Sequence, residues 1–300
     1  MTPLHQRMLE DMQLRHFSPQ TQRSYIHYVT QFAYYYGKSP TLLGLEDIRQ
    51  YQLYLMEDRK LSPQSVNCFV SAAKFLYTVT LEMPWTSEHF IRPKMPERLP
   101  VILSPAEVKE FFAHIGLLKH RVILMVCYGA GLRISEAVSL RVADIDSKRM
   151  VLRVQQGKGG RDRETVLSPR LLWLLRYYYR CYRPKEWLFP TSRPGCHIDP
   201  ETVRQVCRDA CRLAGWTKQV TPHTLRHSFA SHLLDDGADI RVLQALLGHK
   251  RIDTTAHYTA VSHQKIASTV SPLDKLAGAA SAKGKGQTKA KAKLNSTHNA

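Results

Sequence analysis

The sequence lacks any apolar run long enough to cross a membrane. Its clearest apolar stretch covers residues 122–128 and ends at Gly129, far short of the ~20 residues that a bilayer span needs. The first ten residues also lack the apolar core of a secretory signal. We therefore expect a cytoplasmic protein that does not span a membrane.

Cysteine is scarce, and none of the six cysteines belongs to a CxxC pair. The pattern predicts reduced thiols in a cytosol rather than a disulfide framework. Cys207 and Cys211 lie four residues apart, and Cys196-His197 precedes them. No second close pair of ligands accompanies them, so a zinc site is not expected. We predict neither a metal nor an organic cofactor.

Acidic residues are too few to balance the basic ones. The chain holds 43 Lys and Arg against 25 Asp and Glu, a formal charge of +18, with a pI near 9.8. Residues 277–300 contain five lysines and no acidic residue, and we expect this basic tail to be disordered. Most of the excess lies elsewhere and indicates a polyanionic partner, with nucleic acid first and an anionic membrane surface second.

Residues 1–85 predict a compact all-α domain. Ser18-Pro19 and Ser62-Pro63 are typical of helix starts, because serine caps the first turn and proline fits the first helical position. Apolar residues recur at helical spacing after both. Residues 86–104 contain three prolines and several basic residues, which predicts a linker.

Residues 105–276 predict a second, larger domain. Ser104 and Glu107 form a capping box at its first helix. Strands over 150–155 and 164–167 flank a glycine-rich turn, which favours a β-hairpin. The fold class is thus mainly α with a small antiparallel β-sheet. The predicted helices of this domain begin near Ser104 and then cover 119–128, 134–140, 169–182, 200–214, 222–235 and 239–247.

Six residues of chemical interest follow one another through this second domain. Each alone has an ordinary explanation: a solvated arginine, a turn lysine, a surface histidine or a core tyrosine. Together they form the ordered series Arg…Lys…His-x-x-Arg…His…Tyr, made of Arg133, Lys158, His223, Arg226, His249 and Tyr258.

This series closely resembles the tyrosine recombinase (phage integrase/Xer-like) family over roughly residues 105–262. More weakly, residues 1–85 resemble that family's SAM-like, DNA-clamping core-binding domain. The resemblance implies a site-specific recombinase or integrase that cleaves and rejoins double-stranded DNA through a 3′-phosphotyrosyl link, without metal or ATP. It also implies a homo- or hetero-tetramer on two DNA sites, with residues 261–276 docking onto a neighbouring protomer. The short stretch between Lys158 and His223 favours a Xer-like or mobile-element recombinase.

The residue types suit metal-free phosphodiester chemistry. Tyr258 can attack phosphorus and form the covalent intermediate. Arg133 and Arg226 can hold the non-bridging oxygens as permanently charged, planar donors. His223 and His249 can supply hydrogen bonds and move protons near neutral pH.

Two further residues complete this assignment. By analogy with the family, Lys158 donates the proton to the departing 5′ oxygen. Glu136 is expected to orient the arginines rather than to act as an acid or base.

Three other functions compete with this interpretation. A metal-dependent transposase needs converging carboxylates, for which Asp144 and Asp146 are the candidates. A non-enzymatic DNA-binding regulator accounts for the charge but not for the position of Tyr258. A type IB topoisomerase shares the chemistry, but the small N-terminal domain and the modest length favour a recombinase.

Overall fold

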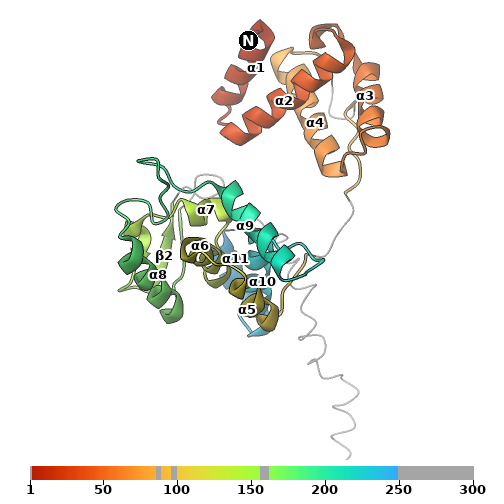
Figure 1. The fold of residues 1–300 in the computed structure, drawn as a ribbon. Helices are drawn as coiled ribbons and strands as arrows, with labels where there is room; N and C mark the ends of the chain where they lie inside the picture. Colours follow the sequence, from red (N-terminus) through yellow and green to blue (C-terminus); the bar gives the residue numbers. More distant parts are fainter. Residues whose placement is uncertain (1, 86–88, 96–99, 156–161, 249–300) are drawn as a thin grey trace, which may run out of the picture. The chain divides into compact units, whose positions relative to one another are not determined.

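A computed structural model describes residues 2–85, 89–95, 100–155 and 162–248. The chain forms two compact units, Met1–Arg98 and Leu99–Ala300, and each is described by itself (Figure 1). The predicted tail, the centre of the glycine-rich hairpin and the segment that contains His249 and Tyr258 lie outside the described residues.

Every regular element in the described part of the first unit is helical, as its sequence predicts. The side chains of Ser18 and Ser62 accept hydrogen bonds from the backbone N–H groups of Thr21 and Ser65, so the two predicted serine caps are confirmed. Its elements are α1 (Pro3–Leu14), α2 (Pro19–Tyr36), η1 (Pro40–Leu42), α3 (Leu45–Glu57), α4 (Pro63–Phe75) and the π-helical turn η2 (Leu76–Thr80).

Aromatic rings fill the core of the first unit. Phe32 of α2, Tyr51 of α3 and Phe69 of α4 contact one another with ring centroids 4.9–5.4 Å apart. Tyr77 is fully buried, and its hydroxyl donates to the carbonyl of Pro40. Rings of this size bury enough apolar surface to hold a domain of under 100 residues together.

The second unit contains seven helices, a 3₁₀ turn and three strands within its described residues. Figure 1 labels the helices of this unit around α6. The elements are α5 (Pro105–Ala113), α6 (Leu118–Gly129), α7 (Ile134–Val138), η4 (Val142–Asp144), β1 (Ile145–Asp146), β2 (Val151–Val154), β3 (Arg163–Val166), α8 (Pro169–Tyr182), α9 (Pro200–Leu213), α10 (Pro222–Asp235) and α11 (Ile240–Leu247).

The three strands form one antiparallel sheet in the order β1-β2-β3. Val151 pairs with Val166 and Val154 with Arg163, so the predicted hairpin and the fold class are confirmed. The sequence did not predict β1 as a strand of its own. Two residues carry too little alternation to be recognised, and β1 is defined by its pairing with β2.

The apolar helix α6 is the centre of the second unit, in contact with α7, α8, α9 and α10. The turn that leaves α6 depends on Gly131, whose φ of +64° favours glycine. A Cβ there would lie 2.4 Å from the Phe229 ring of α10. The turn and α10 therefore approach each other more closely than any side chain at this position permits.

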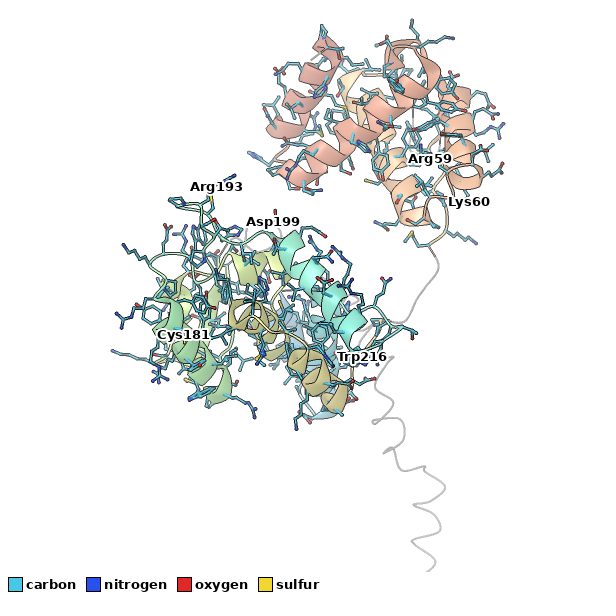
Figure 2. All side chains as sticks on the ribbon, in the orientation of Figure 1. Arg59, Lys60, Cys181, Arg193, Asp199 and Trp216 are labelled. Carbon is cyan, nitrogen blue, oxygen red and sulfur yellow. The ribbon has the colours of Figure 1, made fainter. Side chains whose placement is uncertain are left out.

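Side-chain hydrogen bonds fix the entry into the second unit and the starts of two of its helices. The backbone N–H of Leu103 donates to the hydroxyl of Ser228 on α10, and Ser104 and Glu107 form the predicted capping box of α5. Figure 2 shows Asp199 at the start of α9, where its carboxylate accepts from the N–H of Glu201. Among the described helices, none combines the length and the apolar character of a bilayer span.

Gly131→Ala is expected to lower the free energy of unfolding of the second unit by about 2–5 kcal/mol. A left-handed backbone costs alanine about 1–2 kcal/mol, and the clash with Phe229 adds about 1–3 kcal/mol. Urea unfolding followed by tryptophan fluorescence measures the loss, since three of the four tryptophans belong to the second unit.

Gly129→Ala, two residues earlier, is the matched control. Gly129 ends α6, and its Cβ would meet Leu171 at an ordinary 3.6 Å. Helix propensity then predicts unchanged or slightly raised stability. Equal losses in the two variants would contradict the close approach at Gly131.

Candidate active site

Arg133 owes its position to the short helix that it caps. The residue is the N-cap of α7, directly after the Gly131 turn. Its backbone N–H and its Nη1 donate to the two carboxylate oxygens of Glu136, each at 2.8 Å. The side chain is 18% exposed, and among the described residues its Nε and Nη2 have no acceptor. Arg133 is thus oriented by one contact and still has donors for an anion.

Arg226 lies on α10 and is almost completely buried, with 3% of its side chain exposed. Its Nη1 donates to the carbonyl of Gly131 at 2.6 Å, and its Nη2 donates to the carbonyl of Leu247 at 2.7 Å. Its Nη1 also lies 3.7 Å from Glu136. The guanidinium therefore joins α10 to the Gly131 turn and to the end of α11.

Glu136 receives a third guanidinium, which the sequence analysis missed. Arg163 of β3 donates to both carboxylate oxygens of Glu136, at 2.9 and 2.8 Å. The alternation of side chains along a strand could have revealed that Arg163 faces the interior, because Arg163 shares a face of β3 with the buried Thr165. The expected contact of Glu136 with Arg133 and Arg226 is present, and Arg163 completes the set.

The ionisation of Glu136 follows from these contacts. Burial alone raises the pKa of its carboxyl, but the hydrogen bonds and charge of Arg163 and the two donors of Arg133 outweigh burial and lower the pKa to about 2. Glu136 is therefore ionised at every working pH. Its single negative charge faces three guanidiniums, so these four side chains together carry a formal charge of +2.

His223 lies one helical turn before Arg226, in the first turn of α10. The residue is exposed to solvent, yet desolvation of the ring lowers its pKa, and the positive charges of Arg226, Arg133 and Arg204 lower it further. The imidazole is consequently neutral near pH 7. A neutral imidazole can both donate and accept a hydrogen bond, as a proton-transfer group must.

The structure brings together three of the six residues of the series: Arg133, His223 and Arg226. Lys158, His249 and Tyr258 lie outside the described residues. The two segments that lead to them nevertheless reach the cluster. β3, which follows the Lys158 turn, begins at Arg163, and α11, which precedes His249, ends at carbonyls held by Arg163 and Arg226.

Asp144 and Asp146, the carboxylates of the competing metal-dependent interpretation, are engaged in the sheet. Asp144 accepts from the N–H of Arg141 and from the side-chain amide of Gln155. Asp146 accepts from the guanidinium of Arg153 at 2.9 Å. Both carboxylates therefore hold the edge of the sheet in place.

Comparison with known proteins decides the family. Residues 102–265 match the phage integrase family, and residues 4–87 match the phage integrase N-terminal SAM-like domain. The chain belongs to the phage integrase family. It is a tyrosine-type site-specific recombinase, and its partner is DNA.

Individual relatives agree with this assignment. The chain is 53% identical over 277 residues to a Sinorhizobium fredii (strain NBRC 101917 / NGR234) protein named "Putative integrase/recombinase y4qK", which covers 92% of this chain and 90% of that protein. It is 34% identical over 256 residues to "Tyrosine recombinase XerA" of Pyrococcus horikoshii, covering 84% and 86%. The fold is similar to that of XerH recombinase bound to its difH substrate, with a TM-score of 0.66, 18% identity and coverage of 86% and 82%.

Glu136→Gln is expected to lower the free energy of unfolding by about 3 kcal/mol at pH 7, because it removes one partner of a buried ion cluster. The folded-state pKa of Glu136 lies below its unfolded value, so its contribution is complete above pH ~4.5 and disappears as the pH falls towards 2. The difference between the two proteins should therefore be constant above about pH 5 and narrow below it. Urea unfolding at a series of pH values measures this.

Glu164→Gln is the control for this prediction. Glu164 of β3 pairs with Arg149 of the turn before β2 through two hydrogen bonds, and both side chains are exposed. Exposed pairs contribute little, so a loss below about 1 kcal/mol is expected. A Glu136→Gln protein as stable as the wild type would refute the role given to this carboxylate.

Proposed function

We propose that the chain exchanges DNA strands through a transient bond between Tyr258 and the 3′ phosphate of a cleaved strand. The observation that carries this proposal is the net positive charge of the cluster that Arg133, Arg163 and Arg226 form around Glu136. A scissile phosphate brings negative charge to this cluster. Its transition state carries more negative charge than the ground state, so a fixed cluster of guanidiniums stabilises the transition state selectively.

Each residue has a role in this mechanism. Arg133, whose Nε and Nη2 have no acceptor among the described residues, binds a non-bridging oxygen of the scissile phosphate. Arg226 holds the Gly131 turn and adds positive charge next to it. His223 and His249 hydrogen-bond the phosphate and exchange protons with Tyr258. Tyr258 attacks phosphorus, and the bond to the 5′ oxygen breaks.

Lys158 delivers a proton to that leaving oxygen. The free 5′-hydroxyl of one strand then attacks the phosphotyrosyl bond of the partner duplex and releases Tyr258. One phosphoester replaces another at each step, so the chemistry consumes no ATP and needs no metal.

The two units divide the work on DNA. We assign residues 1–85 to core binding, residues 86–104 to a basic linker and residues 105–276 to catalysis, with residues 277–300 as a basic tail that adds salt-sensitive phosphate contacts. All six cysteines are unpaired. Reduced thiols support a reducing compartment, and we place the reaction in the cytoplasm.

We also propose that two DNA sites are held by a tetramer of this chain or of this chain and a related one. The second unit exposes an apolar groove of about 640 Å³ between α5, α6 and α8. Trp173 at its edge is 61% exposed, and exposed apolar surface of this kind fits a protein partner. Residues 261–276 of a neighbouring protomer, which include Ile266 and Leu273, are the proposed occupant.

Tyr258→Phe is expected to abolish covalent capture of DNA and to leave DNA affinity nearly unchanged. Phenylalanine lacks the attacking oxygen, whereas binding depends on the many phosphate contacts of both units. The assay incubates the protein with a labelled, nicked recombination site in EDTA and resolves covalent complexes by denaturing electrophoresis.

Tyr182→Phe, an exposed tyrosine of α8, is the control and should cleave like the wild type. Covalent capture by Tyr258→Phe would defeat the assignment of the nucleophile. Wild-type cleavage that requires a divalent metal and ceases in EDTA would favour the metal-dependent alternative.

Truncation tests the assembly. A chain that ends at Ala260 should bind one DNA site but lose cooperative pairing of two sites, because the proposed docking segment is missing. A chain that ends at Leu276 removes only the basic tail and is the matched control, for which we expect retained cooperativity and weaker, less salt-dependent binding. Sedimentation of protein–DNA complexes distinguishes one-site from two-site assemblies, and unchanged cooperativity in the shorter chain would contradict the docking role.

A further inference from the structure

Arg163 is the member of the buried cluster that the Arg…Lys…His-x-x-Arg…His…Tyr series does not contain. It is the first residue of β3, paired with Val154 of β2. Its side chain is only 10% exposed, although arginine is rarely buried without a specific partner. The groups that its guanidinium contacts account for this burial.

The guanidinium of Arg163 joins three separate elements. Nη1 and Nη2 donate to the two carboxylate oxygens of Glu136 on α7. Nε donates to the carbonyl of Leu246 on α11 at 3.0 Å. One planar group therefore fixes β3, α7 and the end of α11 against one another, which a single-point cation such as lysine cannot do.

Gly248, the C-cap of α11, lies close against the side chain of Arg163. Gly248 has a φ of +64°, and a Cβ at this position would lie 2.8 Å from Cδ of Arg163. Arg226 holds the adjacent carbonyl of Leu247. The guanidiniums of Arg163 and Arg226 thus donate to the consecutive carbonyls of Leu246 and Leu247 at the C-terminal end of α11, where the helix dipole favours positive charge.

Arg163 also determines how Glu136 meets Arg133. Oε1 of Glu136 accepts from Nη1 of both arginines, and Oε2 accepts from Nη2 of Arg163 and the backbone N–H of Arg133. The bidentate contact with Arg163 fixes the plane of the carboxylate. That plane in turn sets the direction in which the guanidinium of Arg133 points.

We propose that Arg163 is a positioning residue for strand exchange, which holds Glu136 and the end of α11 so that Arg133 meets the scissile phosphate in its reactive orientation. This inference rests on the proposed function. Arg163 acts through Glu136, because both of its Nη atoms donate to that carboxylate, its Nε donates to the carbonyl of Leu246, and its side chain is only 10% exposed.

The test is single-turnover cleavage of a nicked recombination site by Arg163→Lys. The substitution keeps the positive charge but loses the planar guanidinium that donates to both oxygens of Glu136. Cleavage should therefore slow about 10- to 100-fold, the equivalent of one misplaced hydrogen bond to a charged group. DNA affinity should stay within about twofold, since only 10% of the Arg163 side chain is exposed and affinity for DNA depends on many exposed basic residues. Arg149→Lys breaks the exposed bidentate pair with Glu164 on the same sheet and should cleave at the wild-type rate.

A second substrate separates positioning from a general loss of structure. A methylphosphonate at the scissile position lacks one anionic oxygen, so its cleavage depends less on the orientation of Arg133. Arg163→Lys should therefore be impaired clearly less on methylphosphonate than on phosphate. Equal slowing on both substrates, unchanged cleavage of phosphate or a marked loss of DNA affinity would each overturn the proposal.

Two further proteins keep the test decisive. Arg163→Met fills the same space without charge, and it replaces Arg163→Lys in both assays if the lysine variant does not fold. Tyr258→Phe is run in parallel. Covalent capture by Tyr258→Phe would defeat the proposed function itself, whereas a silent Tyr258→Phe together with an unimpaired Arg163 variant would defeat the positioning role alone.

Discussion

The second unit depends on one buried carboxylate, that of Glu136. Without partners its charge would make folding unfavourable, and with Arg133, Arg163 and Arg226 around it the charge is more than balanced. The same arrangement concentrates positive charge around a carboxylate whose side chain is only 6% exposed. In the proposed function, the cluster that stabilises the fold also binds the scissile phosphate.

Backbone geometry delivers the cluster as much as side-chain chemistry does. Gly131 turns the chain so that its carbonyl meets Arg226 and Arg133 begins α7. Gly248 ends α11 in a left-handed conformation, next to the carbonyls that Arg163 and Arg226 hold. Both glycines lie where a Cβ would collide with a neighbour. Distant elements therefore meet at one site because the backbone at these two turns approaches its neighbours without a side chain in between.

A buried cluster also separates an enzyme from a DNA-binding regulator. Non-specific phosphate binding works with exposed lysines and arginines on a surface, and the basic composition of this chain supplies many of them. Arg226 is 3% exposed and holds two carbonyls, which is costly for a residue that merely attracts DNA. A guanidinium of fixed orientation is useful where it must stabilise negative charge that develops at a defined atom during a reaction.

The sequence by itself determined the local structure and the residues of the proposed chemistry. Serine caps followed by proline, helical spacing of apolar residues and the strands around the glycine turn predicted nearly every helix and the hairpin, because these signals act within a few residues. The series from Arg133 to Tyr258 indicated the family, since it is a pattern of residue types and spacings. β1 escaped prediction because two residues hold no periodicity.

The tertiary structure decided which charges meet. Arg163 and Glu136 are 27 residues apart, and Arg226 reaches Gly131 across 95 residues. No local pattern encodes such contacts, because they arise when β3, α7, α10 and α11 pack around α6 and its turn. Burial then turned ordinary arginines into an oriented cluster and held the carboxyl of Glu136 ionised, an effect of desolvation and proximity that exists only in the folded chain.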